Sequence, residues 1–224
     1  MLETQAATVL RQLAIVWGDF TSAVDTVPII AKLLRGKFRL EDYQLFLLNH
    51  RQQVIEGSRW IARAGASVTG EYAEQRSWLL KHAVAEHRDY KMLEDNYVAI
   101  GGKPAAITAT AKNIGTEALH AFMLQRAGEP NPFDLLGAMF IIEGLGQKKA
   151  GLWGKLIKEQ LALTDAQVSF LLYHSANDEA HMQGFEAVLD SGILAINGMA
   201  ERIVKTAKIT ARLYRLQLEE IGNV

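Results

Sequence analysis

The segment FLLYHSANDEAHMQGF, residues 170–185, places two histidines and an aspartate on an otherwise apolar helical stripe. His174, Asp178 and His181 are spaced by four and then three residues, so their side chains share one face of a helix. Phe185 continues the same stripe, which indicates that this face is buried. Two imidazoles and a carboxylate on a buried face must be paired, neutralised by protonation or bound to another group.

Composition limits the classes of protein to which the chain can belong. The 224 residues are 49% hydrophobic, which is enough for one domain with a substantial core, and we expect a single domain over residues 1–224. A net charge of -1 predicts neither a nucleic-acid nor a membrane partner. The absence of cysteine excludes disulfides, thiolate metal sites and a cysteine nucleophile. No apolar run reaches the roughly 18 residues of a membrane span, and MLETQAATVLRQ lacks a hydrophobic signal core, so we expect a cytoplasmic protein.

The apolar pattern predicts an all-α fold. Long segments follow a 3.6-residue period, no convincing alternating strand occurs, and the four prolines lie at breaks between the segments. We expect one compact bundle of about seven to eight helices. The expected helices are 2–23, 27–35, 39–65, 70–100, 104–127, 132–160, 164–190 and 194–221.

A second polar stripe occurs in the expected helix 70–100. His82, Glu86 and Asp89 follow one another at offsets of four and three, between Leu79 and Leu93. On a continuous helix, His82 and Asp89 lie two turns apart on one face, so both could reach metals about 3.5–4 Å apart.

A third helix brings a single carboxylate onto its apolar face. Glu143 lies on the stripe between Phe140 and Ala150. Gly144 and Gly146 follow it, and glycine disfavours a helix interior, so the pair indicates a kink or a close approach of another group; tight helix packing is the alternative.

Each feature also has an ordinary structural explanation when taken alone. His50, on the apolar stripe of the expected helix 39–65, is interpreted as a satisfied core histidine, and HRDYK could be a solvated charge run. Three helices that each bury ionisable groups at mid-stripe are harder to explain, because every isolated buried carboxylate costs several kcal/mol or more. A divalent cation neutralises several carboxylates and accepts neutral imidazoles. Histidine and carboxylate ligands without thiolate suit iron, manganese or zinc.

The motifs resemble those of a known family. The usual ferritin-like signature is Glu-x-x-His on each of two helices, whereas this chain has that spacing once, at Glu117 and His120. HSANDEAH resembles the last metal-binding helix of the haem-oxygenase-like di-iron oxidases, and GAMFIIEGLG resembles their central helix. HAVAEHRDYKMLEDNYVAIGG is similar to their first metal-binding helix. The wider family includes thiaminase-II-like (TenA) and pyrroloquinoline-quinone-synthase (PqqC) proteins and the chlamydial protein associating with death domains.

The resemblance implies a set of metal ligands, with one departure from the family pattern. The family commonly has a Glu followed by a His seven residues later, whereas this chain has His82 and Asp89 at those positions. We expect Asp89 to be the inner ligand of that helix and Glu86 to support it. Some family members also use a Glu from an earlier helix, and Glu56 lies near that position. The implied candidate ligands are His82, Glu86, Asp89, Glu143, His174, Asp178 and His181.

The resemblance also implies the activity. We expect a haem-oxygenase-like bundle that holds two irons per chain, or manganese, and activates O2 against a small organic substrate, as a homodimer, with Glu143 as the bridging ligand. One alternative is a metal-free TenA/PqqC-like or cofactor-binding protein that uses His and carboxylate groups for acid–base catalysis. Another is a non-catalytic helical interaction protein. The chain lacks the cysteine nucleophile of thiaminase-II-like enzymes. It also lacks the histidine near the N-terminus that haem oxygenases need, since its first histidine is His50.

Overall fold

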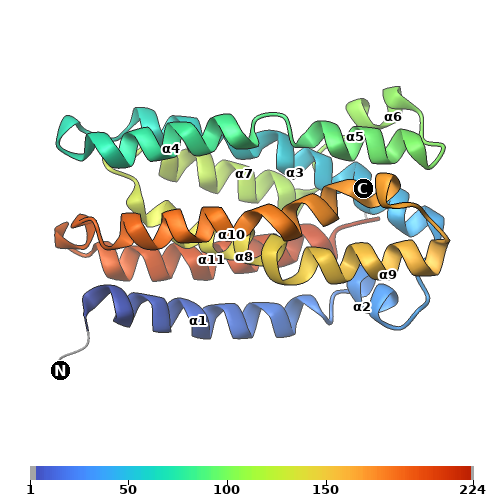
Figure 1. Ribbon diagram of the computed structural model, residues 1–224, viewed down its shortest axis with the longest axis horizontal. Coiled ribbons are helices and arrows are strands. Elements are labelled where there is room, and N and C mark those ends of the chain that lie inside the picture. Colours follow the sequence, from blue (N-terminus) through green and yellow to red (C-terminus); the bar gives the residue numbers. More distant parts are fainter. Residues whose placement is uncertain (1–3, 223–224) are drawn as a thin grey trace.

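The computed structural model describes residues 4–222, except the side chains of residues 177–183. Every regular element in this part of the chain is helical, which confirms the all-α prediction (Figure 1). The α-helices are α1 (Gln5–Val24), α2 (Pro28–Leu34), α3 (Leu40–Ala66), α4 (Ala73–Glu86), α5 (Tyr90–Ala99), α6 (Pro104–Ala109), α7 (Ile114–Ala127), α8 (Leu136–Leu145), α9 (Gly151–Leu161), α10 (Ser169–Leu189) and α11 (Met199–Glu219). Short 3₁₀ turns at 70–72, 133–135, 165–168 and 193–195 and a π-helix, Gly146–Ala150, complete the described elements.

The bundle is built around α3, α10 and α11. α3 packs against α4, α5 and α7, while α11 packs against α1, α7 and α8. α10 contacts α8, α9 and the π-helix between them. Figure 1 shows α1 along one long side of the molecule and α4 with α5 along the opposite side, with α8, α10 and α11 between them. The candidate site lies inside this arrangement, where α3, α4, α8 and α10 face one another.

The expected helix 70–100 is divided, so that prediction was wrong. α4 ends at Glu86 and α5 begins at Tyr90, with a turn over residues 87–89. In the turn, the Nδ1–H group of His87 donates a hydrogen bond to the Val84 carbonyl (2.6 Å), and the Asp89 amide bonds the Glu86 carbonyl three residues back. These local hydrogen bonds replace the regular α-helical pattern. Asp89 therefore does not lie two helical turns beyond His82 on a continuous helix.

Two other expected helices are also divided, which is why the described chain has more helices than the seven to eight expected. The segment 104–127 forms α6 and α7, and the Asn113 side chain caps α7 by accepting a hydrogen bond from the Thr116 amide (2.8 Å). The segment 132–160 is interrupted by the π-helix, which begins at Gly146. Gly144 admits the Trp17 ring, because a Cβ atom there would lie 3.0 Å from it. Both a helix distortion and a close approach thus occur at this glycine pair.

Within residues 4–222, no individual helix combines the length and the apolar character of a membrane span; α1 and α2 meet that test only together, across a 78° bend.

Candidate metal centre

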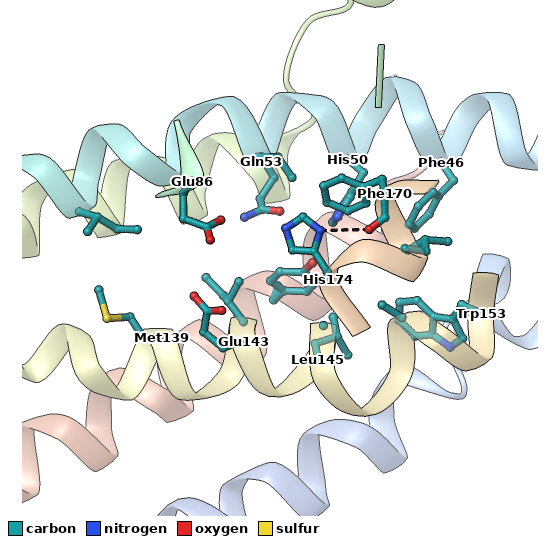
Figure 2. A pocket seen from close by; sticks show the side chains of 18 of the residues that line it. Phe46, His50, Gln53, Glu86, Met139, Glu143, Leu145, Trp153, Phe170 and His174 are labelled. Atoms are coloured by element: carbon teal, nitrogen blue, oxygen red, sulfur yellow. Dashed lines mark hydrogen bonds between the residues drawn. The ribbon is translucent and has the colours of Figure 1, made fainter. Parts of the chain in front are cut away.

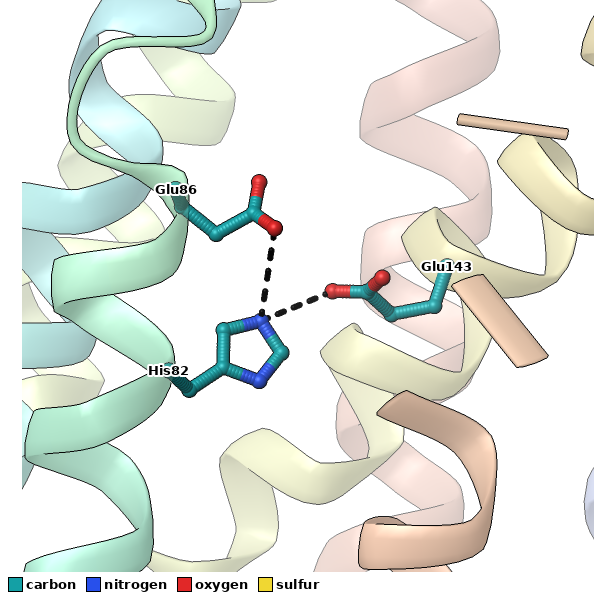
Figure 3. Close-up of side chains that lie close together, drawn as sticks. All are labelled: His82, Glu86 and Glu143. Carbon is teal, nitrogen blue, oxygen red and sulfur yellow. Dashed lines mark ion pairs between the residues drawn. The ribbon is translucent and has the colours of Figure 1, made fainter. Parts of the chain in front are cut away.

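Three side chains from α4 and α8 form a first group of possible metal ligands (Figure 3). The His82 Nε2 atom lies 3.0 Å from Glu143 Oε1 and 4.0 Å from Glu86 Oε1. His82 and Glu86 are one turn apart on α4, so both project toward α8, which carries Glu143. The side chain of His82 is almost fully buried, with 3% of its surface exposed.

A second group joins the turn after α4 to α10. The Asp89 Oδ2 atom lies 3.2 Å from His174 Nε2, and both side chains are largely buried. The helix is interrupted at residues 87–89, and this turn brings Asp89 into contact with His174 on α10. Glu86 completes the group with Asp89 and His174.

Glu86 is the residue shared by the two groups. In each group, one ligand atom from every residue lies within 4.8 Å of the others. The sequence predicted Glu86 as a supporting residue beside Asp89 and assigned the bridging position to Glu143. Among the described side chains it is Glu86 that lies between both histidines, because α4 ends at Glu86 and turns Asp89 toward His174.

The close approach of three carboxylates changes the ionisation of Glu86. Burial, and then repulsion from Glu143 and Asp89, raises the pKa of Glu86 to about 7, although His82 and His174 oppose the rise. A carboxylate whose anionic form is disfavoured in this way is stabilised by a nearby cation. The electrostatics of the group therefore match a site for positive charge.

The hydrogen bond made by His174 indicates which of its ring nitrogens is available to a metal. Its Nδ1 atom lies 3.0 Å from the Phe170 carbonyl, which can only accept, so Nδ1 carries the proton. In the neutral imidazole, Nε2 then presents its lone pair to the Asp89 carboxylate, which is also an acceptor. A second proton or a cation between the two atoms resolves this conflict. Metal-binding histidines usually donate their other ring N–H to a carbonyl or carboxylate in the same way, so the residues fit a metal.

The described donors are two imidazoles and three carboxylates, a set that suits iron or manganese. Arg51 and Lys149, two cations carried by neighbouring segments, pair with Glu94 and Asp25 respectively. The remaining predicted ligands, Asp178 and His181, lie on α10 but outside the described side chains.

Glu56 belongs to a separate polar cluster. Its buried carboxylate binds Lys112 Nζ at 2.7 Å and Arg59 Nη1 at 2.9 Å, and His120 Nδ1 lies 3.5 Å away. These neighbours hold the pKa of Glu56 below its ordinary value in spite of burial. The structure therefore places Glu56 in an ion-pair network and does not group it with the donors around Glu86.

A cavity lies beside the two donor groups (Figure 2). Glu86, Glu143 and His174 form one part of its wall. Most of the other lining residues are aromatic or aliphatic. His50 and Gln53, from consecutive turns of α3, add polar groups to this wall.

The sequence was interpreted as placing His50 in the core with its ring nitrogens hydrogen-bonded. The second part of that interpretation was wrong. The ring packs against Phe46, Phe170 and Tyr214, but its buried Nδ1 atom has no hydrogen-bond partner among the described residues. Apolar spacing correctly places the residue inside the bundle, whereas the cavity beside it has no signal in the sequence.

Comparison with known protein families gives a match over most of the chain. The sequence profile of a family described as iron-containing redox enzymes matches residues 58–215, the segment that carries every predicted ligand. No curated protein matches the chain.

Solved structures share the fold at low sequence identity. A domain of unknown function with a haem-oxygenase-like fold from Shewanella denitrificans OS217 superposes with a TM-score of 0.86 at 19% identity, over 94% of this chain and 90% of its own. A TenA homologue from P. horikoshii OT3 superposes at 0.74 and 14% identity, over 96% and 98% of the two chains. Another from Pseudomonas syringae pv. tomato DC3000 gives 0.74 and 13%, over 96% and 93%. The predicted haem-oxygenase-like fold is confirmed.

Proposed function

The chain belongs to the family of iron-containing redox enzymes, and from this premise we propose that it is a non-haem oxidoreductase that uses two irons and O2 to oxidise a small organic molecule. The observation that carries the proposal is the pair of donor groups joined through Glu86. Two neighbouring ligand groups with a shared carboxylate are the arrangement expected of a dinuclear site in a helical bundle.

The proposed ligands divide between the two positions. His82, Glu86 and Glu143 would hold one iron, and Glu86, Asp89 and His174 the other. The predicted ligands Asp178 and His181 would complete the set from α10. When bound, the irons supply the redox chemistry with O2, while the protein supplies ligand geometry and a shielded cavity.

The side chains around the ligands have their own tasks. The hydrogen bond from His174 Nδ1 to the Phe170 carbonyl fixes the imidazole tautomer and directs Nε2 toward Asp89. The apolar lining of the cavity limits the access of water to Glu86 and Glu143, which lie in its wall.

The alternative is a metal-free enzyme that uses acid–base catalysis, as the TenA/PqqC-like reading of the sequence allows. It is favoured by the two close imidazole–carboxylate pairs, His82 with Glu143 and His174 with Asp89. Such pairs commonly transfer protons in enzymes.

Metal analysis separates the two functions. The protein is expressed in iron-supplemented medium, and its metal content is measured by elemental analysis. The di-iron proposal predicts about two irons per chain and an absorption change when the anaerobic ferrous protein meets O2. Protein that binds no iron or manganese under these conditions contradicts it and supports the acid–base alternative.

A further inference from the structure

The wall of the cavity beside the candidate metal centre contains an unusual histidine. His50 stacks on Phe46, with ring centroids 5.0 Å apart and planes inclined by 21°, and meets the edge of Phe170 at 5.3 Å. Its Nδ1 atom is buried and has no hydrogen-bond partner within the described part of the chain. Burial, followed by the proximity of His174, lowers the pKa of His50 to about 3, so the ring is neutral at physiological pH.

A buried polar atom without a partner is destabilising, since it has lost its hydrogen bonds with water. A neutral imidazole offers one donor and one acceptor. Gln53 lies one turn further along α3, and its amide extends toward the same cavity in Figure 2.

The rest of the cavity determines what these polar groups can meet. The described lining includes Trp60, Met139, Trp153 and Tyr214, and it contains no Lys or Arg. An anionic group placed against His50 would therefore be buried without a cationic side chain among the described lining residues, which is strongly unfavourable. An apolar body with an uncharged hydrogen-bonding group matches both the wall and the unsatisfied imidazole.

We propose that His50 and Gln53 form a polar anchor in this cavity, and that the cavity accepts a small, largely apolar molecule whose uncharged hydroxyl or N–H group bonds the anchor. This assignment names the substrate class of the site and rests on the proposed function. The hydrogen bond would select the molecule and orient its apolar body toward the wall that carries Glu86 and Glu143.

The test uses 4-ethylphenol and 4-ethyltoluene, which differ by a hydroxyl in place of a methyl group. Binding to the full chain is measured by calorimetry, as isolated and after removal of metal with a chelator. In both forms we expect 4-ethylphenol to bind about 3- to 10-fold more tightly than 4-ethyltoluene, as one net hydrogen bond allows. The anion 4-ethylbenzoate should bind the metal-free protein at least about tenfold more weakly than 4-ethylphenol.

Two variants identify the anchor. His50→Phe should abolish or reverse the preference for the phenol while leaving the affinity for 4-ethyltoluene within about twofold, which shows that the cavity remains intact. Gln53→Leu should reduce the preference. Gln125→Leu is the matched control, because Gln125 is exposed and bonds Glu129, and it should change neither affinity.

Several results would overturn the inference: no binding of either neutral probe, equal binding of both by the unsubstituted protein, an unchanged preference in His50→Phe, or equal binding of the benzoate. Iron content is determined on the same preparations. Protein with two irons and no phenol preference overturns this assignment alone, whereas iron-free protein with the preference overturns the di-iron proposal alone.

Discussion

Asp89 Oδ2 lies 3.2 Å from His174 Nε2, although Asp89 follows the end of α4 and His174 lies within α10. This contact depends on the turn at residues 87–89, and the same turn leaves Glu86 between His82 and His174. The position of Glu86, more than that of any single histidine, therefore links the two donor groups.

The first prediction compares Glu86 with Asp89. Glu86→Gln removes an anionic ligand from both groups and should lower bound iron from about two per chain to less than one, because amides are weak iron ligands. Asp89→Asn alters one group and should retain about one iron. Iron titration of the two variants measures the difference, with the exposed Glu71→Gln as control. Loss of more iron from Asp89→Asn than from Glu86→Gln would show that Glu86 is the supporting residue.

The second prediction separates His174 from His50. His174→Ala should reduce bound iron strongly, because it removes the imidazole of one donor group. His50→Ala should leave the iron content unchanged and lower the free energy of unfolding by about 1–3 kcal/mol through lost aromatic packing. Elemental analysis and urea denaturation measure these effects. An equal loss of iron in both variants would place His50 among the ligands.

The third prediction concerns the pH dependence of the metal-free protein. The folded pKa of Glu86, about 7, exceeds its ordinary value of 4.5, so the folded state retains a proton that the unfolded state releases. The stabilisation is present below pH 4.5 and is lost as the pH rises toward 7 and above. Glu86→Gln cannot lose a proton, so at pH 8 it should be more stable than the unsubstituted protein by about 2–3 kcal/mol.

This difference is measured by denaturant unfolding of both proteins between pH 4 and 8, in the presence of a chelator. The two stability curves should converge near pH 4 and separate as the pH rises. Parallel curves would show that Glu86 ionises normally and that the three carboxylates are less tightly grouped than described.

The fourth prediction concerns Glu56. Glu56→Gln should leave the iron content unchanged, because its carboxylate pairs with Lys112, Arg59 and His120. It should lower the free energy of unfolding by about 1–3 kcal/mol, since Lys112 and His120 lose their buried anionic partner. Iron analysis and urea denaturation test both parts, and a loss of iron would add Glu56 to the ligand set.

The sequence predicted the buried faces more reliably than the helix ends. His82, Glu143 and His174 were placed on interior stripes, and the structure brings them to the same interior region. The period of a helix identifies its buried face without regard to its length. The break after Glu86 coincides with a side-chain hydrogen bond from His87 to the Val84 carbonyl, which the apolar pattern does not record.

The roles of Glu56 and His50 required tertiary information. Glu56 meets Lys112 and His120 from segments far along the chain, so its ion pairs could not be inferred from local spacing. His50 has apolar neighbours on its own helix, as a core histidine would, and the cavity is formed only when α3, α8 and α10 assemble.

The π-helix Gly146–Ala150 sets the rotational phase between two halves of one helical segment. A π-helical turn contains more residues than an α-helical turn, and one residue corresponds to a rotation of about 100° about the helix axis. Upstream of it, Glu143 points toward His82; downstream, Trp153 and Ile157 are buried among other helices. Loss of one residue between 146 and 150 would rotate one half against the other. The number of residues in this short segment therefore allows Glu143 to face His82 while Trp153 and Ile157 stay buried.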